Sequence, residues 1–252
     1  MATLPPGWTP VPAALKGRTV LVTGATGGLG RASALACAEA GATVILLGRK
    51  VSTLEKLYDE IEALGGAAPA IYPLNLEGAT PADYEELAAT VEREFGGLDG
   101  LVHAAAHFAG LQPLREFKPE EWMRVLQVNL NGPFLLTQAL LPLLQQSADA
   151  SVVFVQDDPA RGSKSFWGAY GVAKAALGAL AGILHDETDS SSVRIATLLP
   201  PPMRTALRRM AYFGENTLER PEPAEFASAV VYLLGVEGAA ARGQVLDLRT
   251  TH

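Results

Sequence analysis

Seven short apolar runs recur along the chain, and longer segments with helical periodicity separate them. The runs read RTVLVTG, ATVILLG, APAIYPL, LDGLVHA, ASVVFVQ, VRIATLL and GQVLDLR. A strand that is apolar at successive positions is buried on both faces, as in a parallel sheet between two layers of helices. Parallel strands need crossover connections, which are right-handed and leave few alternative topologies. We therefore predict an α/β fold with one doubly wound parallel sheet of about seven strands and helices on both faces.

No repeat, low-complexity tract or linker interrupts this alternation, and 252 residues suit one large α/β domain. We predict a single domain over residues 17–252, preceded by an irregular arm over residues 1–16 that contains four prolines. Two segments lack clear periodicity, residues 107–121 and a lid segment at about 201–220. Both follow a predicted strand, and open α/β sheets bind ligands at the carboxyl ends of their strands. The predicted helices are 28–40, 51–64, 81–95, 120–146, 167–188 and 222–234.

Charge and composition exclude several classes of function. The net charge of −7 argues against nucleic acid or an anionic membrane as the main partner, because both would be repelled. The N-terminal residues resemble neither a signal peptide nor a membrane span, so we expect a cytoplasmic location. Cys37 is the single cysteine, which excludes an internal disulfide and a multi-cysteine metal site. Its alanine-rich surroundings predict a buried structural thiol.

A glycine-rich turn, Thr23-Gly24-Ala25-Thr26-Gly27-Gly28-Leu29-Gly30, joins the first predicted strand to the first helix. Gly24 permits a tight turn, Gly28 allows the backbone to approach a pyrophosphate, and Gly30 allows close helix–strand packing. The helix N-terminus presents N–H groups and a positive dipole to the phosphates. Glycines also serve plain turns, but the strand before and the helix after this cluster favour a dinucleotide site of the Rossmann type.

The end of the second strand indicates which dinucleotide binds. Folds that prefer NAD usually carry an acidic residue there, which accepts hydrogen bonds from the ribose 2′-hydroxyl. This chain has Gly48, Arg49 and Lys50 instead. An arginine suits a 2′-phosphate, so NADP(H) is predicted over NAD(H), although a solvated basic pair on a loop is the alternative. Asn75, after the third strand, is the expected neighbour of the adenine.

Tyr170 and Lys174 are four residues apart in a predicted helix and therefore share one face. An ammonium group near a tyrosine hydroxyl stabilises the phenolate and lowers the pKa of the tyrosine, which makes it a usable acid or base near neutral pH. The pair follows the fifth strand of a fold that begins with the glycine turn. Chance is a poor explanation for that combination.

Together these motifs make the chain resemble the short-chain dehydrogenase/reductase family from Gly17 to Leu248: the TGxxxGxG turn, the Val128-Asn129 dipeptide and the YxxxK pair. The resemblance implies that Tyr170 is the catalytic acid/base, that Lys174 lowers its pKa and binds the nicotinamide ribose, and that Asn129 holds the water of a proton relay. It also implies a homodimer or homotetramer formed through the helices of 120–146 and 167–188. The cofactor-binding residues expected from the motifs and the resemblance are Thr23, Gly24, Thr26, Gly28, Leu29, Gly30, Arg49, Asn75, Leu76, Ala104, Tyr170, Lys174 and Pro200.

Several positions depart from the family pattern, most of them at the nicotinamide end. The catalytic serine usually lies thirteen residues before the tyrosine, where this chain has Asp157. An ionised aspartate cannot donate a hydrogen bond to a substrate carbonyl, although a buried, protonated one can. Ser163 and Ser165 are alternative donors nearby in sequence. The asparagine- and glycine-containing segment after the fourth strand reads His103-Ala-Ala-Ala, the proline-glycine after the sixth reads Pro200-Pro-Pro, and Asn75 replaces a common aspartate.

Two functions remain open. The first is an NADP(H)-dependent oxidoreductase that transfers hydride between the nicotinamide and an unknown alcohol or carbonyl substrate. The second is a catalytically impaired or non-catalytic relative that keeps the nucleotide; a scaffold without nucleotide fits the intact glycine turn badly. No metal site is predicted, because His103 and His107 lack cysteine or carboxylate partners in the sequence nearby. The arginines of the lid segment could meet an anionic substrate but are typical of a solvated face: Arg204, Arg208 and Arg209.

Overall fold

All seven apolar runs form strands of one parallel sheet in the computed structural model, which describes residues 1–249. The spatial order is β3-β2-β1-β4-β5-β6-β7, so the predicted doubly wound Rossmann fold is confirmed. The strand order reverses between β1 and β4, which pair in parallel with Val20 opposite Gly100. The strands are β1 (Thr19–Thr23), β2 (Thr43–Gly48), β3 (Ala70–Pro73), β4 (Gly100–His103), β5 (Ala150–Val155), β6 (Val193–Leu199) and β7 (Val245–Asp247).

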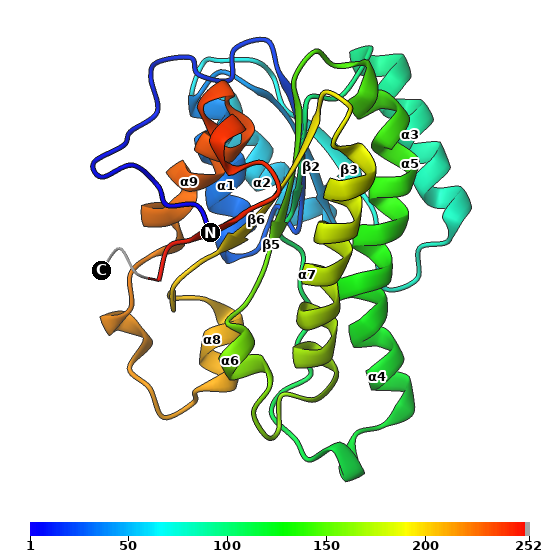
Figure 1. Cartoon of the computed structure of the whole chain (residues 1–252), viewed down its shortest axis with the longest axis vertical. Coiled ribbons are helices and arrows are strands. Elements are labelled where there is room, and N and C mark those ends of the chain that lie inside the picture. The colour runs from blue at the N-terminus through cyan, green and yellow to red at the C-terminus, as the bar shows by residue number, and fades with distance from the viewer. Residues whose placement is uncertain (250–252) are drawn as a thin grey trace.

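Helices cover both faces of the sheet (Figure 1). One layer comprises α1 (Gly28–Glu39), α2 (Val51–Glu62) and α9 (Ala227–Leu234), and the other α3 (Pro81–Phe95), α5 (Gly132–Gln146) and α7 (Gly168–Thr188). Successive strand residues point to opposite faces, so Val22 packs in the first layer's core and Leu21 in the second's. Cys37 is buried in the first core, as predicted, and burial raises the pKa of its thiol to about 12.

The helix predicted over 120–146 is present, but it is not α-helical throughout. It divides into α4 (Pro119–Leu126), a π-helical segment (Gln127–Asn131) and α5. Pro133 explains the division, because it has no N–H to donate to the carbonyl of Asn129 four residues earlier. The wider turn moves Asn129 into the interior, where its side chain is buried. Single π turns of this kind are frequent at functional sites.

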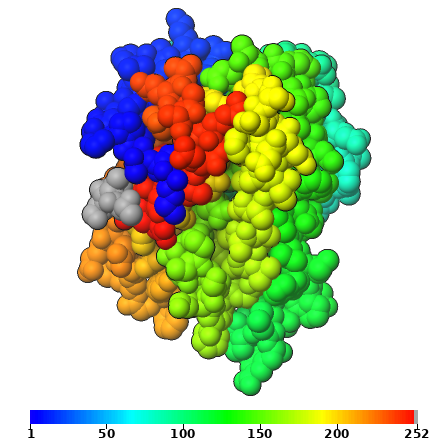
Figure 2. Space-filling view, viewed as in Figure 1, coloured from blue at the N-terminus to red at the C-terminus, as the bar shows by residue number. Residues whose placement is uncertain are grey.

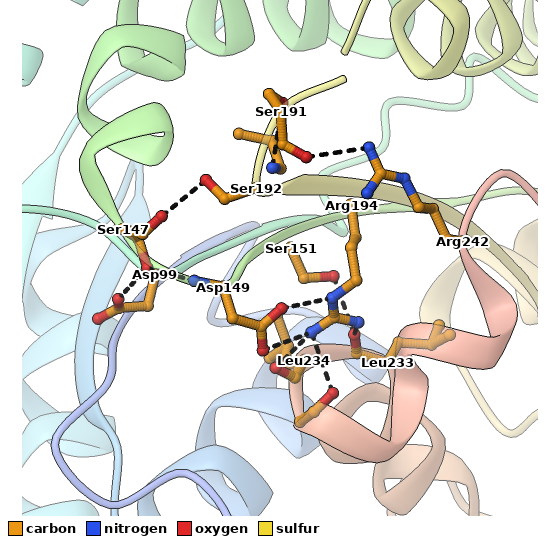
Figure 3. Close-up of polar contacts among 12 residues, drawn as sticks. Asp99, Ser147, Asp149, Ser151, Ser191, Ser192, Arg194, Leu233, Leu234 and Arg242 are labelled. Carbon is orange, nitrogen blue, oxygen red and sulfur yellow. Dashed lines mark hydrogen bonds and ion pairs between the residues drawn. The ribbon is translucent and has the colours of Figure 1, made fainter. Parts of the chain in front are cut away.

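A polar network joins the amino ends of β4, β5 and β6 (Figure 3). The Arg194 side chain, 5% exposed, donates to both carboxylate oxygens of Asp149 at 2.7 and 3.1 Å. It also donates to the carbonyls of Leu233 and Gly235 at the end of α9, each at 3.0 Å. Arg18 pairs with the same Asp149 carboxylate at 3.0 Å. This network links the sheet to α9 at the end opposite the strands' carboxyl termini.

The N-terminal arm lies against the C-terminal segment, as the blue and red atoms show in Figure 2. Ala2 forms a parallel bridge with Leu246 of β7, and its N–H donates to the carbonyl of Val245 at 2.9 Å. Trp8 donates to Glu237 at 2.7 Å and packs edge-on against Tyr232 of α9. The arm thereby covers the outer edge of β7, with which no other strand of the described chain pairs.

Candidate active site

A cleft of about 360 Å³ runs across the carboxyl ends of the strands. Its walls come from the glycine turn, the ends of β2 to β6, and the segments that contain α6 (Pro159–Gly162) and α8 (Ala206–Ala211), which lie beyond the sheet in Figure 1. The cleft occupies the place at which open α/β sheets bind ligands. It is lined by these residues of the predicted site: Gly24, Thr26, Gly28, Leu29, Gly30, Arg49, Asn75, Leu76, Ala104, Asp157, Tyr170, Lys174 and Pro200.

The glycine turn is shaped for close approach. Gly24 has a φ of +62°, and a Cβ on it would lie 2.7 Å from the backbone of Ala105. A Cβ on Gly30 would overlap the carbonyl oxygen of Gly24, so the turn and the helix contact each other through backbone alone. No side chain caps the α1 N-terminus at Gly27. Its first-turn N–H groups therefore remain available to a pyrophosphate, and the cradle fits a dinucleotide.

The end of the cleft next to β2 carries a cation that is mostly exposed. The Arg49 side chain is 62% exposed and lies 4.0 Å from the Glu77 carboxylate. Glu77 makes its shorter ion pair with Arg124, at 2.7 Å. Asn75 lies beside them and accepts a hydrogen bond from the Glu77 backbone at 3.3 Å. Among the described residues lining this end, Arg49 therefore has the geometry expected for a 2′-phosphate ligand.

Tyr170 and Lys174 project from the first turns of α7 and are both buried. The Lys174 ammonium donates to the carbonyl of Val155 at 2.8 Å and lies 5.9 Å from the centre of the Tyr170 ring. Burial lowers the pKa of Lys174 to about 8. The expected lowering of the Tyr170 pKa is wrong for this arrangement: burial raises the pKa, and the opposing cation is Arg161, not Lys174. The ammonium and the phenol oxygen do not contact each other directly.

Asp157 occupies the centre of the substrate end. Its carboxylate accepts a hydrogen bond from the Tyr170 hydroxyl at 2.9 Å and another from the Asp158 backbone N–H at 2.7 Å. It also forms an ion pair with Arg161 of α6. A group that accepts all three is arranged as a hydrogen-bond acceptor, which speaks against the hypothesis of a protonated, donating Asp157. Ser163 and Ser165 do not replace it, because both are exposed and neither lines the cleft.

Three residues named in the sequence analysis lie behind the walls of the cleft and do not line it: Thr23, Asn129 and His103. Thr23 accepts hydrogen bonds from Ala104 and Ala105, both at 3.1 Å, and so fixes the loop after β4. The Asn129 amide donates to the carbonyls of His107 and Val125, each at 2.8 Å, and anchors the same loop. His103 is buried, and its ring lies 2.8 Å from the Thr137 hydroxyl. Burial, with a contribution from Lys174, lowers the pKa of His103 to about 3.

Several lining residues were not predicted. The lid segment contributes Met203, Leu207 and Tyr212, and the segment before α7 contributes Arg161 of α6 and Trp167. Of the lid arginines, Arg204 and Arg209 stay outside the cleft, and Arg208 is paired with Glu215 at 2.6 Å. These positions have no periodicity or motif. The run of aromatic residues in SFWGAY, next to the tyrosine, is the one signal that could have indicated them.

Within residues 1–249, no group of three metal-ligating side chains lies close enough together to hold an ion. His107 contacts Glu121 at 2.5 Å, but no third ligand joins them. In the same part of the chain, no helix has the length and hydropathy needed to cross a membrane.

Comparison with known proteins shows similarity to short chain dehydrogenases in both sequence and structure. Residues 18–214 match the model of the short chain dehydrogenase family. The uncharacterised oxidoreductase YciK of Escherichia coli K12 is 35% identical over 233 residues, 92% of each chain. A structure from Pseudomonas syringae, assigned as a short chain dehydrogenase, is 42% identical with a TM-score of 0.90 and covers 95% of this chain and 98% of its own. A similarly assigned protein of Escherichia coli CFT073, in complex with NADPH, is 35% identical with a TM-score of 0.89 over 93% of this chain and 98% of its own.

Proposed function

This chain belongs to the short-chain dehydrogenase family, and on that premise we propose that it is an NADP(H)-dependent oxidoreductase acting on a carbonyl or alcohol substrate. The observation that carries the proposal is the single cleft that joins the uncapped α1 N-terminus and Arg49 to Tyr170 and Lys174. A similar protein forms a complex with NADPH, which supports the choice of nucleotide.

In this proposal the glycine turn holds the pyrophosphate, Arg49 holds the 2′-phosphate, and Lys174 faces the nicotinamide ribose. Bound NADPH supplies the hydride. Tyr170 holds the proton that the substrate oxygen receives. Lys174, whose pKa of about 8 keeps it mostly charged at pH 7, favours the phenolate that remains through its field from 5.9 Å away, without direct contact. Before it can donate to the substrate, the Tyr170 hydroxyl must leave Asp157, its hydrogen-bond acceptor here. That exchange predicts slow turnover.

The nucleotide preference is tested by fluorescence titration with NADPH and NADH. We expect NADPH to bind at least about tenfold more tightly, a difference of about 1.4 kcal/mol that one charge-assisted contact supplies. Arg49→Ala should remove most of that preference. Arg31→Ala is the matched control, because Arg31 is also an exposed arginine with a glutamate partner but lies outside the cleft. Equal affinities for the two nucleotides, or an unchanged ratio in Arg49→Ala, would contradict this part of the proposal.

The chemistry is tested by NADPH oxidation across a panel of aldehydes and ketones. We expect slow reduction of some members by the wild type and none by Tyr170→Phe, because the variant has no proton to transfer. Tyr170→Phe should still bind NADPH, because the glycine turn and Arg49 are unchanged. Asp157→Ser should increase the rate, since a serine hydroxyl donates where the carboxylate accepts. Nucleotide binding without turnover in the wild type and in Asp157→Ser would instead indicate a non-catalytic relative.

We also propose that the chain forms a homodimer or homotetramer through α5 and α7. The outer faces of these helices expose apolar side chains: Phe134 at 42%, Val172 at 49% and Ile183 at 56%. Small residues of α7, such as the exposed Gly182, permit close approach of a second helix. Closed symmetry is the common arrangement for such contacts.

A further inference from the structure

The substrate end of the cleft needs a hydrogen-bond donor that Asp157 does not provide. Reduction of a carbonyl places negative charge on its oxygen, and a fixed donor that meets this charge contributes strongly to the rate. In this chain the Asp157 carboxylate accepts from Tyr170 and Arg161 on its two different oxygens. The Tyr170 phenol and the Arg161 guanidinium therefore both bind the Asp157 carboxylate. This carboxylate lies where the reacting carbonyl would meet Tyr170.

The Arg161 side chain has donor capacity left over. A guanidinium carries five N–H donors, and one of its terminal nitrogens is committed to Asp157. Its Nε is buried without a hydrogen-bond partner. The side chain is 21% exposed, and it lines the cleft. Unpartnered buried Nε atoms also occur at Arg18 and Arg242, so the capacity available to a ligand lies in the other terminal nitrogen of Arg161, which makes no hydrogen bond to the described residues.

The guanidinium is also held firmly in place. It lies 5.0 Å from the centre of the Trp167 ring and 6.0 Å from that of Tyr212, which are cation–π distances. Helix α6, which carries it, packs on α7 where Gly162 meets Gly171, and a Cβ on Gly171 would overlap the Gly162 carbonyl oxygen. Gly171 directly follows Tyr170, so this backbone contact sets the position of Arg161 relative to the phenol.

Other described donors at this end make their hydrogen bonds to groups other than Asp157. Arg208 binds Glu215 through two nitrogens, at 2.6 and 2.8 Å. Lys174 donates to the Val155 carbonyl. Ser163 is exposed and donates to the Pro159 carbonyl. Among the described cations near Tyr170, Arg161 is the one that binds the same carboxylate as the phenol, that of Asp157.

We propose that Arg161 is a catalytic residue that donates a guanidinium hydrogen bond to the substrate carbonyl oxygen. The inference rests on the proposed function. Hydride from NADPH adds to the carbonyl carbon, the carbonyl π pair moves to the oxygen, and that oxygen takes the Tyr170 proton while Arg161 keeps its own protons throughout. Because Asp157 balances the charge of Arg161, the site favours an uncharged aldehyde or ketone, flanked by the apolar surfaces of Trp167 and Leu207.

The test is a double-mutant cycle between Arg161 and Asp157. Arg161→Met keeps an unbranched apolar stem and removes every donor, and we expect it to lower kcat about a hundred- to a thousandfold with NADPH affinity unchanged. Because the single variant leaves Asp157 without its ion-pair partner, the same change is made in the Asp157→Ala background. The loss there should be of similar size. Asp157→Ser should restore at least tenfold of the rate lost in Arg161→Met. Lys164→Met, a change at an exposed cation of the same loop, is the control.

The outcomes separate the two proposals. If Arg161→Met changes kcat less than threefold in the Asp157→Ala background, Arg161 only neutralises Asp157, and the inference is overturned while the proposed function stands. If neither the wild type nor Asp157→Ser reduces any carbonyl, the proposed function fails and the inference fails with it. Thermal denaturation of each variant shows whether a loss of rate reflects a loss of folded protein.

Discussion

Replacement of Arg194 by methionine should destabilise the protein strongly and leave nucleotide binding intact. The change removes a guanidinium that is 5% exposed and bonded to Asp149 and to three carbonyls at the end of α9. Breaking a buried ion pair by removing one partner destabilises by about 3–5 kcal/mol. Asp149 is 33% exposed and keeps Arg18, and the carbonyls of Leu233 and Gly235 keep their hydrogen bonds from Ser151 and Gly238. Both facts favour the lower end of that range.

The size of the effect follows from the length of the chain. For a protein of this size, about 1 kcal/mol lowers Tm by roughly 2 °C, so we expect a decrease of about 6–10 °C. Circular dichroism measures Tm, and urea unfolding at constant m measures the free energy. NADPH affinity should not change, because the network lies at the amino ends of the strands and the cleft at their carboxyl ends.

Arg242→Met is the matched control. Arg242 also donates to backbone carbonyls, those of Thr188 and Ser191, but its carboxylate partner Asp189 is 71% exposed and 3.6 Å away. A surface pair of this kind contributes about 1 kcal/mol or less. A decrease in Tm below 2 °C for Arg194→Met, or a decrease no larger than that of Arg242→Met, would refute the reasoning. So would a parallel loss of NADPH affinity.

Three further predictions concern pH, the glycine turn and assembly. His103 has a pKa of about 3 in the folded protein and about 6.5 in the unfolded chain, so the unfolded chain takes up the proton first. The free energy of unfolding should therefore fall by up to about 1.4 kcal/mol per pH unit as pH drops from 6.5 towards 3. Urea unfolding of His103→Gln should show a smaller dependence of this free energy on pH. Gly30→Ala should weaken NADPH binding more than tenfold in a titration, since its Cβ overlaps the turn, whereas Gly182→Ala, with open space around it, should bind normally. Sedimentation should show a species larger than 26.5 kDa at micromolar concentration, and Ile183→Glu should shift it towards monomer; a wild type that is only monomeric would contradict the proposed assembly.

The sequence predicts the sheet and the phosphate end of the cleft because both depend on local patterns. Continuous apolar runs identify buried parallel strands, and the glycines from Gly24 to Gly30 mark a turn that only backbone can fill. The tyrosine–lysine spacing likewise places both side chains in the cleft, at the start of α7. In each case the residues that define the feature are neighbours in the chain.

The substrate end was predicted less well because its contacts join segments that are distant or irregular. The π-helical turn at Gln127–Asn131 comes from a proline whose effect reaches back four residues, against a strong helical period. Arg161 lies on a helix of four residues, too short to show periodicity, and its role depends on Asp157 and on rings from other segments. The direction of the Tyr170 pKa shift depends on burial, which no spacing of residues indicates.

The bridge between Ala2 and Leu246 has a consequence for folding kinetics. The two residues are almost the full chain apart, so the arm can dock only after β7 has joined β6 at the edge of the sheet. Contacts of such long sequence separation form late, and late contacts are mostly absent from the transition state for folding. Weakening the arm should therefore accelerate unfolding and leave the rate of folding nearly unchanged. The first residues of the chain therefore slow the separation of the last strand from the sheet.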